Sequence, residues 1–211
     1  MPHLVLLGDS IFDNGAYTDG QPAVIDHVRE HLPAEWKATL AAIDGSTTED
    51  IAAQITGRPD DATHLALSVG GNDAVLRADV LDTPMNSSGQ ALHLLGQAAG
   101  AFEISYRQVI DACLATGLPL TVCTVYNGCF PDPGQQQRVT VALTVFNDVI
   151  LRTAVQHKLT VIELRLVCME LGDYANPIEP SAQGGDKIAQ VVVRSVLEPA
   201  HESEAARVLA A

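Results

Sequence analysis

Basic residues are scarce in this sequence. Its 12 lysines and arginines stand against 26 aspartates and glutamates, which gives a formal net charge of −14 at pH 7. Binding to a nucleic-acid backbone or to an anionic membrane needs a basic face, and no cluster of Lys or Arg supplies one. We therefore expect no nucleic-acid and no membrane partner, and the acidity is typical of a soluble protein.

Paired cysteines, long apolar runs and a secretory leader are missing as well. The four cysteines form no C-x-x-C pair, so their spacing supports neither a zinc site nor a disulfide framework. No apolar run approaches the roughly 18 to 20 residues of a membrane span. The start, MPHLVLLGDS, has neither the cationic region nor the long apolar stretch of a signal peptide. We expect reduced, mostly buried thiols in a cytoplasmic protein, with no metal and no cofactor.

The composition is that of an ordinary globular protein. Hydrophobic residues make up 47% of the 211 residues and charged residues 18%, which is enough for one domain with a sizeable core. We find no internal repeat and no linker. The sequence predicts one domain over residues 1–200, followed by a C-terminal tail, residues 201–211, that extends over the surface.

Short apolar runs alternate with helical patterns along the chain. The runs lack strict alternation, as expected for central strands covered on both faces, and they lie at 3–7, 37–43, 64–69, 120–126 and 159–164. Helices are predicted from Pro22, from a capping box of Ser46 and Glu49, and over 88–116, 135–157 and 181–197. This order favours a three-layer α/β/α sandwich around a flavodoxin-like, five-stranded parallel sheet of order 2-1-3-4-5.

Small and polar residues follow each of the first three predicted strands. In such sheets ligands bind at the carboxyl ends of the strands, where Gly8-Asp9-Ser10, Asp44-Gly45-Ser46 and Gly70-Gly71-Asn72-Asp73 would meet. Ser10 is the candidate nucleophile. The backbone N–H groups of Ser10 and Gly45 and the side-chain amide of Asn72 can converge on the oxyanion that acyl transfer creates. A glycine at position 45 also permits an unusual backbone conformation.

The GDS stretch, the glycine of the second block and the GGND stretch together resemble the SGNH (GDSL) hydrolase family, from Gly8 to the final helix. The resemblance implies an α/β/α fold and hydrolysis of carboxylic esters through an acyl-enzyme on Ser10. It also implies that Gly45 and Asn72 are oxyanion donors. Asp9 and Asp73 resemble residues that hold the turn and the loop.

The last block of that family departs from the expected pattern here. The family has D-x-x-H before a proline and a helix, whereas this chain has Asn176 and Glu179 before Pro180. A Ser-His-Asp triad cannot be built there. Among the seven histidines His93 is the best substitute, but it lies off the apolar stripe of its helix. Glu179 is the remaining candidate base, weaker than histidine by about two pKa units unless burial raises its pKa.

Three functions remain open at this stage. The first is a serine esterase or lipase-like acyl hydrolase that acts on a small-molecule ester. The second is a catalytically impaired or non-catalytic binding protein that keeps the pocket. The third is an acyltransferase that uses the same residues. The loops at 74–90 and 126–135 are expected to shape the pocket, and the oligomeric state is not determined.

Overall fold

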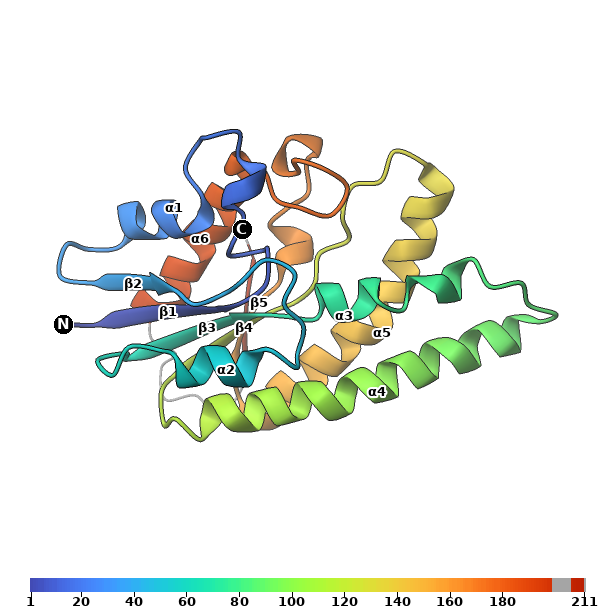
Figure 1. Ribbon diagram of the computed structural model, residues 1–211, viewed down its shortest axis with the longest axis horizontal. Coiled ribbons are helices and arrows are strands. Elements are labelled where there is room, and N and C mark those ends of the chain that lie inside the picture. The colour runs from blue at the N-terminus through green and yellow to red at the C-terminus, as the bar shows by residue number, and fades with distance from the viewer. Residues whose placement is uncertain (199–205, 211) are drawn as a thin grey trace.

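A six-stranded parallel sheet forms the centre of the computed structural model, which describes residues 1–198 and 206–210 (Figure 1). The strand order is β2-β1-β3-β4-β5-β6, and every neighbouring pair is parallel. The strands are β1 (His3–Gly8), β2 (Lys37–Leu40), β3 (His64–Ser68), β4 (Leu120–Cys123), β5 (Thr160–Ile162) and β6 (Arg207–Leu209).

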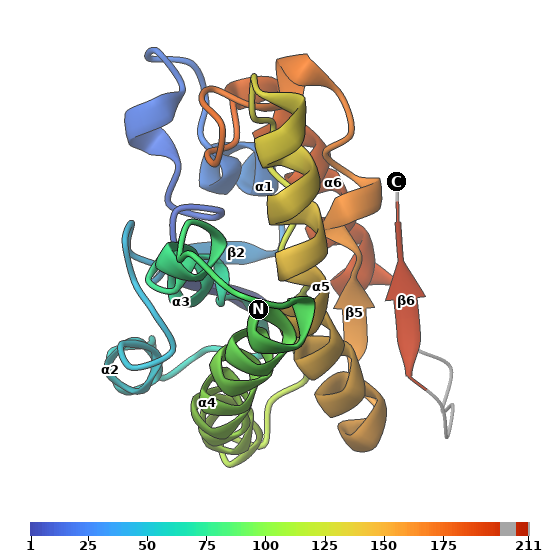
Figure 2. The same ribbon diagram turned by 90° about the vertical axis from the view of Figure 1, so that its right-hand side faces the viewer.

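Helices cover both faces of the sheet (Figure 2). They are α1 (Val24–His31), α2 (Ile51–Thr56), α3 (Gly71–Val75), α4 (Ser88–Leu114), α5 (Pro133–His157) and α6 (Ala182–Leu197). Successive side chains of a strand point to opposite faces, so Leu4 and Leu6 join the core under α1 and α6. Val5 and Leu7 join the core under α2, α4 and α5. All of β1 is buried, which explains its continuous apolar run.

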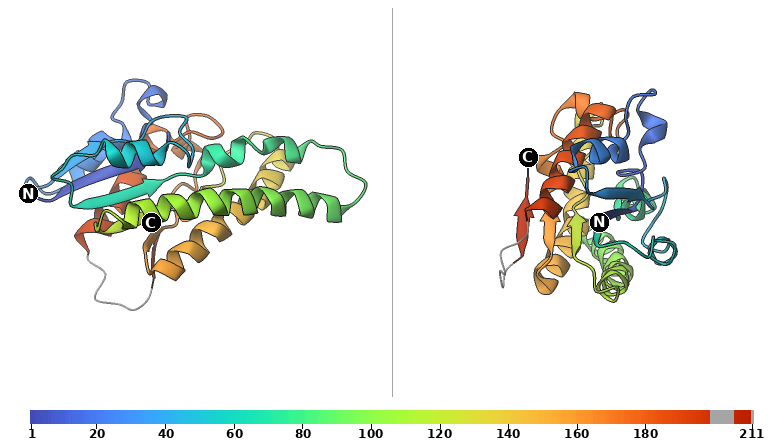
Figure 3. Two further views of the ribbon diagram at one scale, coloured as in Figure 1. Left: turned by 60° about the horizontal axis from the view of Figure 1, so that its bottom comes forward. Right: turned by 90° about the vertical axis from the view of Figure 1, so that its left-hand side faces the viewer.

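The long helices begin at side-chain caps that the sequence carries. Ser87 caps α4 by accepting a hydrogen bond from the Gln90 N–H, and Ser181 caps α6 in the same way from Gly184. Asp132 caps α5, whose first residue is Pro133. The N-terminal halves of α4 and α5 extend beyond the sheet, on the side where the strands end (Figure 3).

The three-layer fold and the strand order 2-1-3-4-5 are confirmed, with one added strand. β6 pairs in parallel with β5, although the sequence analysis placed this segment in a surface tail. Three residues carry too little apolar pattern to predict a strand. Residues 201–205 and 211 of that tail lie outside the described residues.

The predicted capping box of Ser46 and Glu49 is wrong. Helix α2 begins at Ile51, after Asp50, and the buried Ser46 hydroxyl instead accepts a hydrogen bond from Gln54. The polar residues before α2 form turns, in which the Thr47 N–H bonds the Asp50 carboxylate.

Helix α5 is, within the described ranges, the one helix long and apolar enough by length and composition to cross a membrane, with a mean hydropathy of 1.2. The sequence analysis missed this because polar residues interrupt its apolar runs. In the fold, α5 buries Phe146, Val149 and Ile150 in the core and packs along α4. Of the apolar window, 33% is buried inside the fold.

Candidate active site

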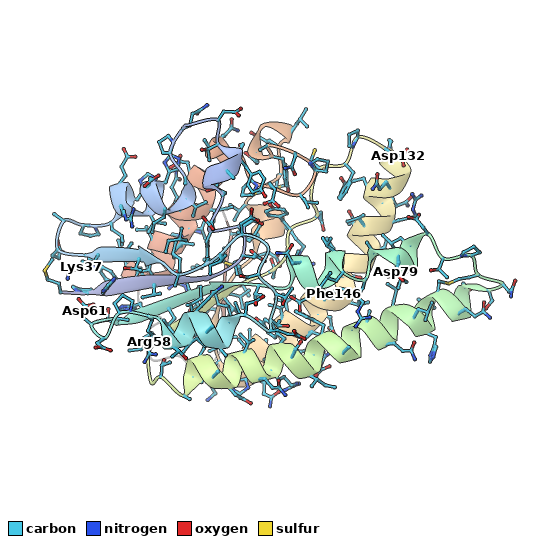
Figure 4. The ribbon with its side chains drawn as sticks, viewed as in Figure 1. Lys37, Arg58, Asp61, Asp79, Asp132 and Phe146 are labelled. Carbon is cyan, nitrogen blue, oxygen red and sulfur yellow. The ribbon has the colours of Figure 1, made fainter. Side chains whose placement is uncertain are left out.

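A cavity of about 340 Å³ opens where β1, β3 and β4 end. Ser10, Asn72 and Glu179, three of the four predicted site residues, line it. Its other walls come from α3, the 3-10 turn Ala78–Leu81, α4 and α5. Figure 4 labels Phe146, a lining residue, on α5 close to α3, while Asp79 and Asp132 lie farther from the sheet. Both loops that were predicted to shape the pocket, at 74–90 and 126–135, contribute residues to its wall, among them Arg77 and Phe130.

The turn that carries Ser10 depends on Gly8. Its φ is +135°, and a Cβ on Gly8 would lie 1.8 Å from the Ser68 carbonyl oxygen, so no other residue fits. The chain then turns through Asp9, whose carboxylate accepts a hydrogen bond from the Ile11 N–H at 3.1 Å. Ser10 is 6% exposed, and its backbone N–H has no hydrogen-bond partner among the described residues. That N–H is therefore available to a ligand.

Asn72 and Gly45 are close in the fold but do not line the same hollow. The Asn72 Nδ2 donates to the Ser46 carbonyl oxygen at 2.9 Å, which leaves its second amide hydrogen for the cavity. Gly45 lines the adjoining hollow with Asp44 and Ser46. Its φ is +82°, as the prediction of an unusual backbone requires. The hydrogen bond from Asn72 to Ser46 therefore links a residue of the cavity wall to a residue of the adjoining hollow.

Glu179 is held against Ser10 by a loop with several fixed points. The Asn176 carboxamide oxygen accepts hydrogen bonds from the N–H groups of Ile178 and Glu179, both at 3.0 Å. The Tyr126 hydroxyl donates to the Ile178 carbonyl at 2.8 Å. Asn14 donates to the Pro180 carbonyl at 3.3 Å. The Asn176 side chain therefore shapes the backbone of this loop.

The Glu179 carboxyl group is buried and incompletely bonded. It is 7% exposed, and its Oε2 has no hydrogen-bond partner in the part of the chain that the structure describes. Burial raises the pKa of Glu179, hydrogen bonding by the Ser10 hydroxyl lowers it, and the negative charge of Asp44 raises it. A carboxylate with an elevated pKa and an unused oxygen, next to a hydroxyl, can accept a proton.

Asp44 and Tyr17 form the acidic rim beside Glu179. The Tyr17 hydroxyl donates to the Asp44 carboxylate at 2.8 Å, and this bond is the main reason that the pKa of Tyr17 is raised to about 12. Asp73, which was expected to hold a loop, accepts hydrogen bonds from the Thr48 hydroxyl at 2.6 Å and from the Thr48 N–H. These contacts fix the backbone on both sides of Gly45.

Burial raises the pKa of Asp9 to about 8; the Ile11 N–H bond lowers it, and the charge of Glu179 raises it further. The unfolded value is near 3.8, so between about pH 4 and 8 the folded state holds a proton that the unfolded state loses. The contribution of Asp9 to the free energy of unfolding is therefore fully present below about pH 4 and is lost as the pH rises to about 8.

We expect Asp9→Asn, which resembles the protonated carboxyl group, to reduce the loss of stability between pH 5 and 8. The change in the free energy of unfolding over this range should shrink by on the order of a few kcal/mol, measured by urea unfolding. Asp13→Asn, the same substitution in the same turn, is the control. An unchanged pH slope in Asp9→Asn would contradict this assignment.

Two buried amide side chains that the sequence analysis did not single out fix the strand ends. Gln54 on α2 accepts from the Gly8 N–H and donates to the Gly8 carbonyl, both at 2.8 Å. Asn147 on α5 bonds both backbone groups of Val125 in the same way, again at 2.8 Å. Each lies on an otherwise apolar helix face, which is the signal that could have identified them.

No histidine lines the cavity among residues 1–198 and 206–210. His93 is exposed on α4 and is not part of the wall. His3 lies 2.7 Å from Asp61 at the end of the sheet where the strands begin, and Figure 4 labels Asp61 far from Phe146. The others are His27 and His31 on α1, His64 at the start of β3, His157 at the end of α5, and His201, which lies outside the described residues.

Residues 6–187 match the model of the GDSL-like lipase/acylhydrolase family, and the chain belongs to that family. The family assignment supports a hydrolase of ester bonds. No curated protein sequence matches the chain.

Solved structures with the same fold include lipolytic enzymes. An extracellular lipase from Streptomyces rimosus has a TM-score of 0.67 at 18% identity, with 93% of this chain and 99% of that chain covered. A lipase/acylhydrolase from Enterococcus faecalis has a TM-score of 0.63 at 20% identity, with 93% and 95% covered. At these identities the likeness establishes the fold alone.

Proposed function

We propose that the protein is a serine esterase that hydrolyses carboxylic esters through an acyl-enzyme on Ser10. The observation that carries this proposal is the meeting of Ser10, Asn72 and the buried Glu179 in one cavity. The family supports ester hydrolysis in general. The covalent mechanism and the roles of the individual residues rest on the geometry of the cavity.

The reaction begins when the Ser10 hydroxyl attacks the ester carbonyl and its proton passes to the Glu179 carboxylate. The tetrahedral intermediate then collapses, the bond to the leaving alcohol breaks, and Glu179 returns the proton to the departing alkoxide. Water, deprotonated by Glu179, then attacks the acyl-serine carbonyl. The second tetrahedral intermediate collapses, the bond to the Ser10 Oγ breaks, and Glu179 returns the proton to Ser10 as the carboxylic acid leaves. Glu179 needs no partner to set a tautomer, which is consistent with an asparagine at position 176.

The oxyanion of each intermediate needs hydrogen-bond donors that are already in position. The Ser10 N–H is the first, because it has no partner in the described structure. The remaining amide hydrogen of Asn72 is the second. The Gly45 N–H, also without a partner among the described residues, is the third donor that we propose. Gly45 lies in the adjoining hollow, beside Asp44 and Ser46.

The cavity beyond these polar groups suits an apolar acyl group. The apolar side chains in its wall include Leu81, Leu95, Val139, Leu143 and Phe146. Burying each methylene of an acyl chain there contributes about 0.8 kcal/mol. We therefore expect esters of medium-length acids to be better substrates than acetates.

Filling this wall should change the preference for acyl length. Ala142 lines the cavity, so Ala142→Phe is expected to displace the far end of the acyl chain. Losing about two buried methylenes corresponds to about a tenfold fall in the ratio of kcat/KM for octanoate over acetate. Val141→Phe is the matched control, because Val141 is 58% exposed and does not line the cavity. Equal ratios in the two variants would argue against this acyl site.

The wild-type protein provides the test of the proposed function. p-Nitrophenyl esters of increasing acyl length should be hydrolysed, and a fluorophosphonate should add once, at Ser10, as located by peptide mass spectrometry. The absence of a histidine from the described cavity wall favours one other function, a binding protein that retains the pocket. If the protein shows no turnover and no labelling at any pH, that result would select the binding function over the esterase.

A further inference from the structure

We propose a second site, independent of the esterase function: His27, His31 and Asp186 bind a divalent transition-metal ion, with zinc as the best fit. His27 and His31 lie one turn apart on α1, and Asp186 lies on α6. One ligand atom from each residue lies within 4.8 Å of the other two. No metal was expected from the sequence, in which no cluster of ligands is visible; Asp186 is 155 residues from His31.

The helices that carry the three residues pack directly against each other. α1 and α6 lie side by side on one face of the sheet (Figures 1 and 2) and make extensive contacts. Residues at i and i+4 share one face of a helix, so His27 and His31 point together towards α6. Asp186 comes from the second turn of α6 and faces both imidazoles.

To bind zinc, the Asp186 Oδ1 must move away from His31 Nε2 and closer to His27 Nδ1, in each case by less than about 1 Å. The Asp186 Oδ1 lies 2.6 Å from His31 Nε2 and 3.6 Å from His27 Nδ1. Two ligand atoms at 2.0–2.1 Å from a tetrahedral zinc are about 3.3 Å apart. Small rotations of the side chains are enough to reach that arrangement.

The His27 side chain is nearly buried and lacks ordinary hydrogen bonds. Its side chain is 14% exposed, and its Nε2 is buried without a hydrogen-bond partner in the described structure. Its Nδ1 is 3.6 Å from Asp186 and 4.0 Å from Glu30, beyond ordinary hydrogen-bond length. The Nδ1 therefore has no hydrogen bond to lose when it binds a metal, while the unpartnered Nε2 gains no partner from the metal.

Neighbouring side chains orient the proposed ligands. Gln190 donates to the second Asp186 oxygen, Oδ2, at 2.9 Å, which leaves Oδ1 directed at the histidines. Glu30 lies on the same face and can approach as a fourth ligand, or water can take that position. Two imidazoles and one carboxylate are ligands that zinc accepts, whereas calcium and magnesium prefer oxygen alone.

A metal at this position would tie α1 to the start of α6. Asp186 follows Glu179 by seven positions, and Asn14 connects the segment before α1 to Pro180. The site is therefore expected to stabilise the fold around the loop that carries Glu179. It provides no group to the cavity.

The test is metal binding by the full-length chain, with any purification tag removed. Isothermal titration with ZnCl₂ should give one equivalent, and the unfolding temperature should rise with zinc concentration. Co²⁺, used as a probe, should give the visible absorption of a tetrahedral site. His31→Gln, at a position that is 32% exposed and should fold, is expected to weaken zinc binding more than about 100-fold.

Two further variants are expected to have smaller effects on zinc affinity, or none. Gln190→Leu removes the hydrogen bond to Asp186 but none of the proposed ligands, and it should weaken zinc binding by about 10-fold. His93→Gln removes an exposed histidine on α4 and should bind zinc like the wild type. Wild-type protein that binds no zinc at about 100 µM, or a His31→Gln variant that binds as tightly as wild type, would overturn the proposal. Because the readout is binding, neither outcome depends on esterase activity.

Discussion

Ester turnover by a Ser10→Ala variant is expected to fall about 10⁴-fold or more in kcat, the scale on which removing a nucleophile acts. Ser10 lies in the cavity against Glu179, and no neighbouring hydroxyl occupies the same turn. The residual rate would come from the oxyanion donors and from binding alone. The measurement is kcat for a p-nitrophenyl ester, together with labelling by a fluorophosphonate.

The control is a serine of similar burial outside the cavity. Ser195 on α6 is 8% exposed and donates to the Val192 carbonyl at 2.7 Å, so Ser195→Ala should keep wild-type turnover. Both variants should retain the circular dichroism of the wild type, which separates lost chemistry from lost folding. Fluorophosphonate labelling that survives in Ser10→Ala would assign the nucleophile to another residue.

Glu179→Gln is the second large effect that we expect, a loss of at least about 10²-fold in kcat. Glutamine keeps the size of the side chain but cannot accept the Ser10 proton. The pH profile distinguishes this role from a structural one. Because the base must be ionised, wild-type activity should rise with pH through the raised pKa of Glu179. The low residual activity of Glu179→Gln should lack this rise.

Two variants change the base or its surroundings without removing it. Glu179→His should recover part of the rate, with the rise in activity near the pKa of histidine, about 6.5. Asp44→Asn should move the wild-type rise to lower pH, because the Asp44 charge raises the pKa of Glu179. Wild-type turnover in Glu179→Gln would remove this residue from the mechanism.

Much of the fold could be predicted because the information is local. The apolar run at 3–7 predicts a buried central strand, and the stripe along 88–116 predicts the helix observed at Ser88–Leu114. Parallel strands end on one side of the sheet, which predicted that Ser10 and Asn72 would meet. The family resemblance, now established by the match over residues 6–187, came from these same blocks.

The failures concern contacts between residues distant in the chain. Ser46 reads as a helix cap, but Gln54 and the Thr48–Asp73 contact hold the chain in turns there. The Arg207–Leu209 strand has too short a pattern to predict, and only the open edge of β5 explains it. Gly45 follows its strand as expected, yet it lines the adjoining hollow and not the cavity of Ser10. The direction in which a loop residue faces depends on tertiary contacts that the local sequence does not show.

The sequence by itself determined the main helices, the parallel sheet and the position of Ser10 after β1, and it singled out Glu179 as a candidate base. These follow from the period of apolar residues and from the chemistry of single side chains. Only the tertiary structure decided which groups meet: Asn14 with Pro180, 166 residues apart, and His31 with Asp186, 155 residues apart. It also decided the raised pKa values of Asp9 and Glu179, because burial and neighbouring charge act through space.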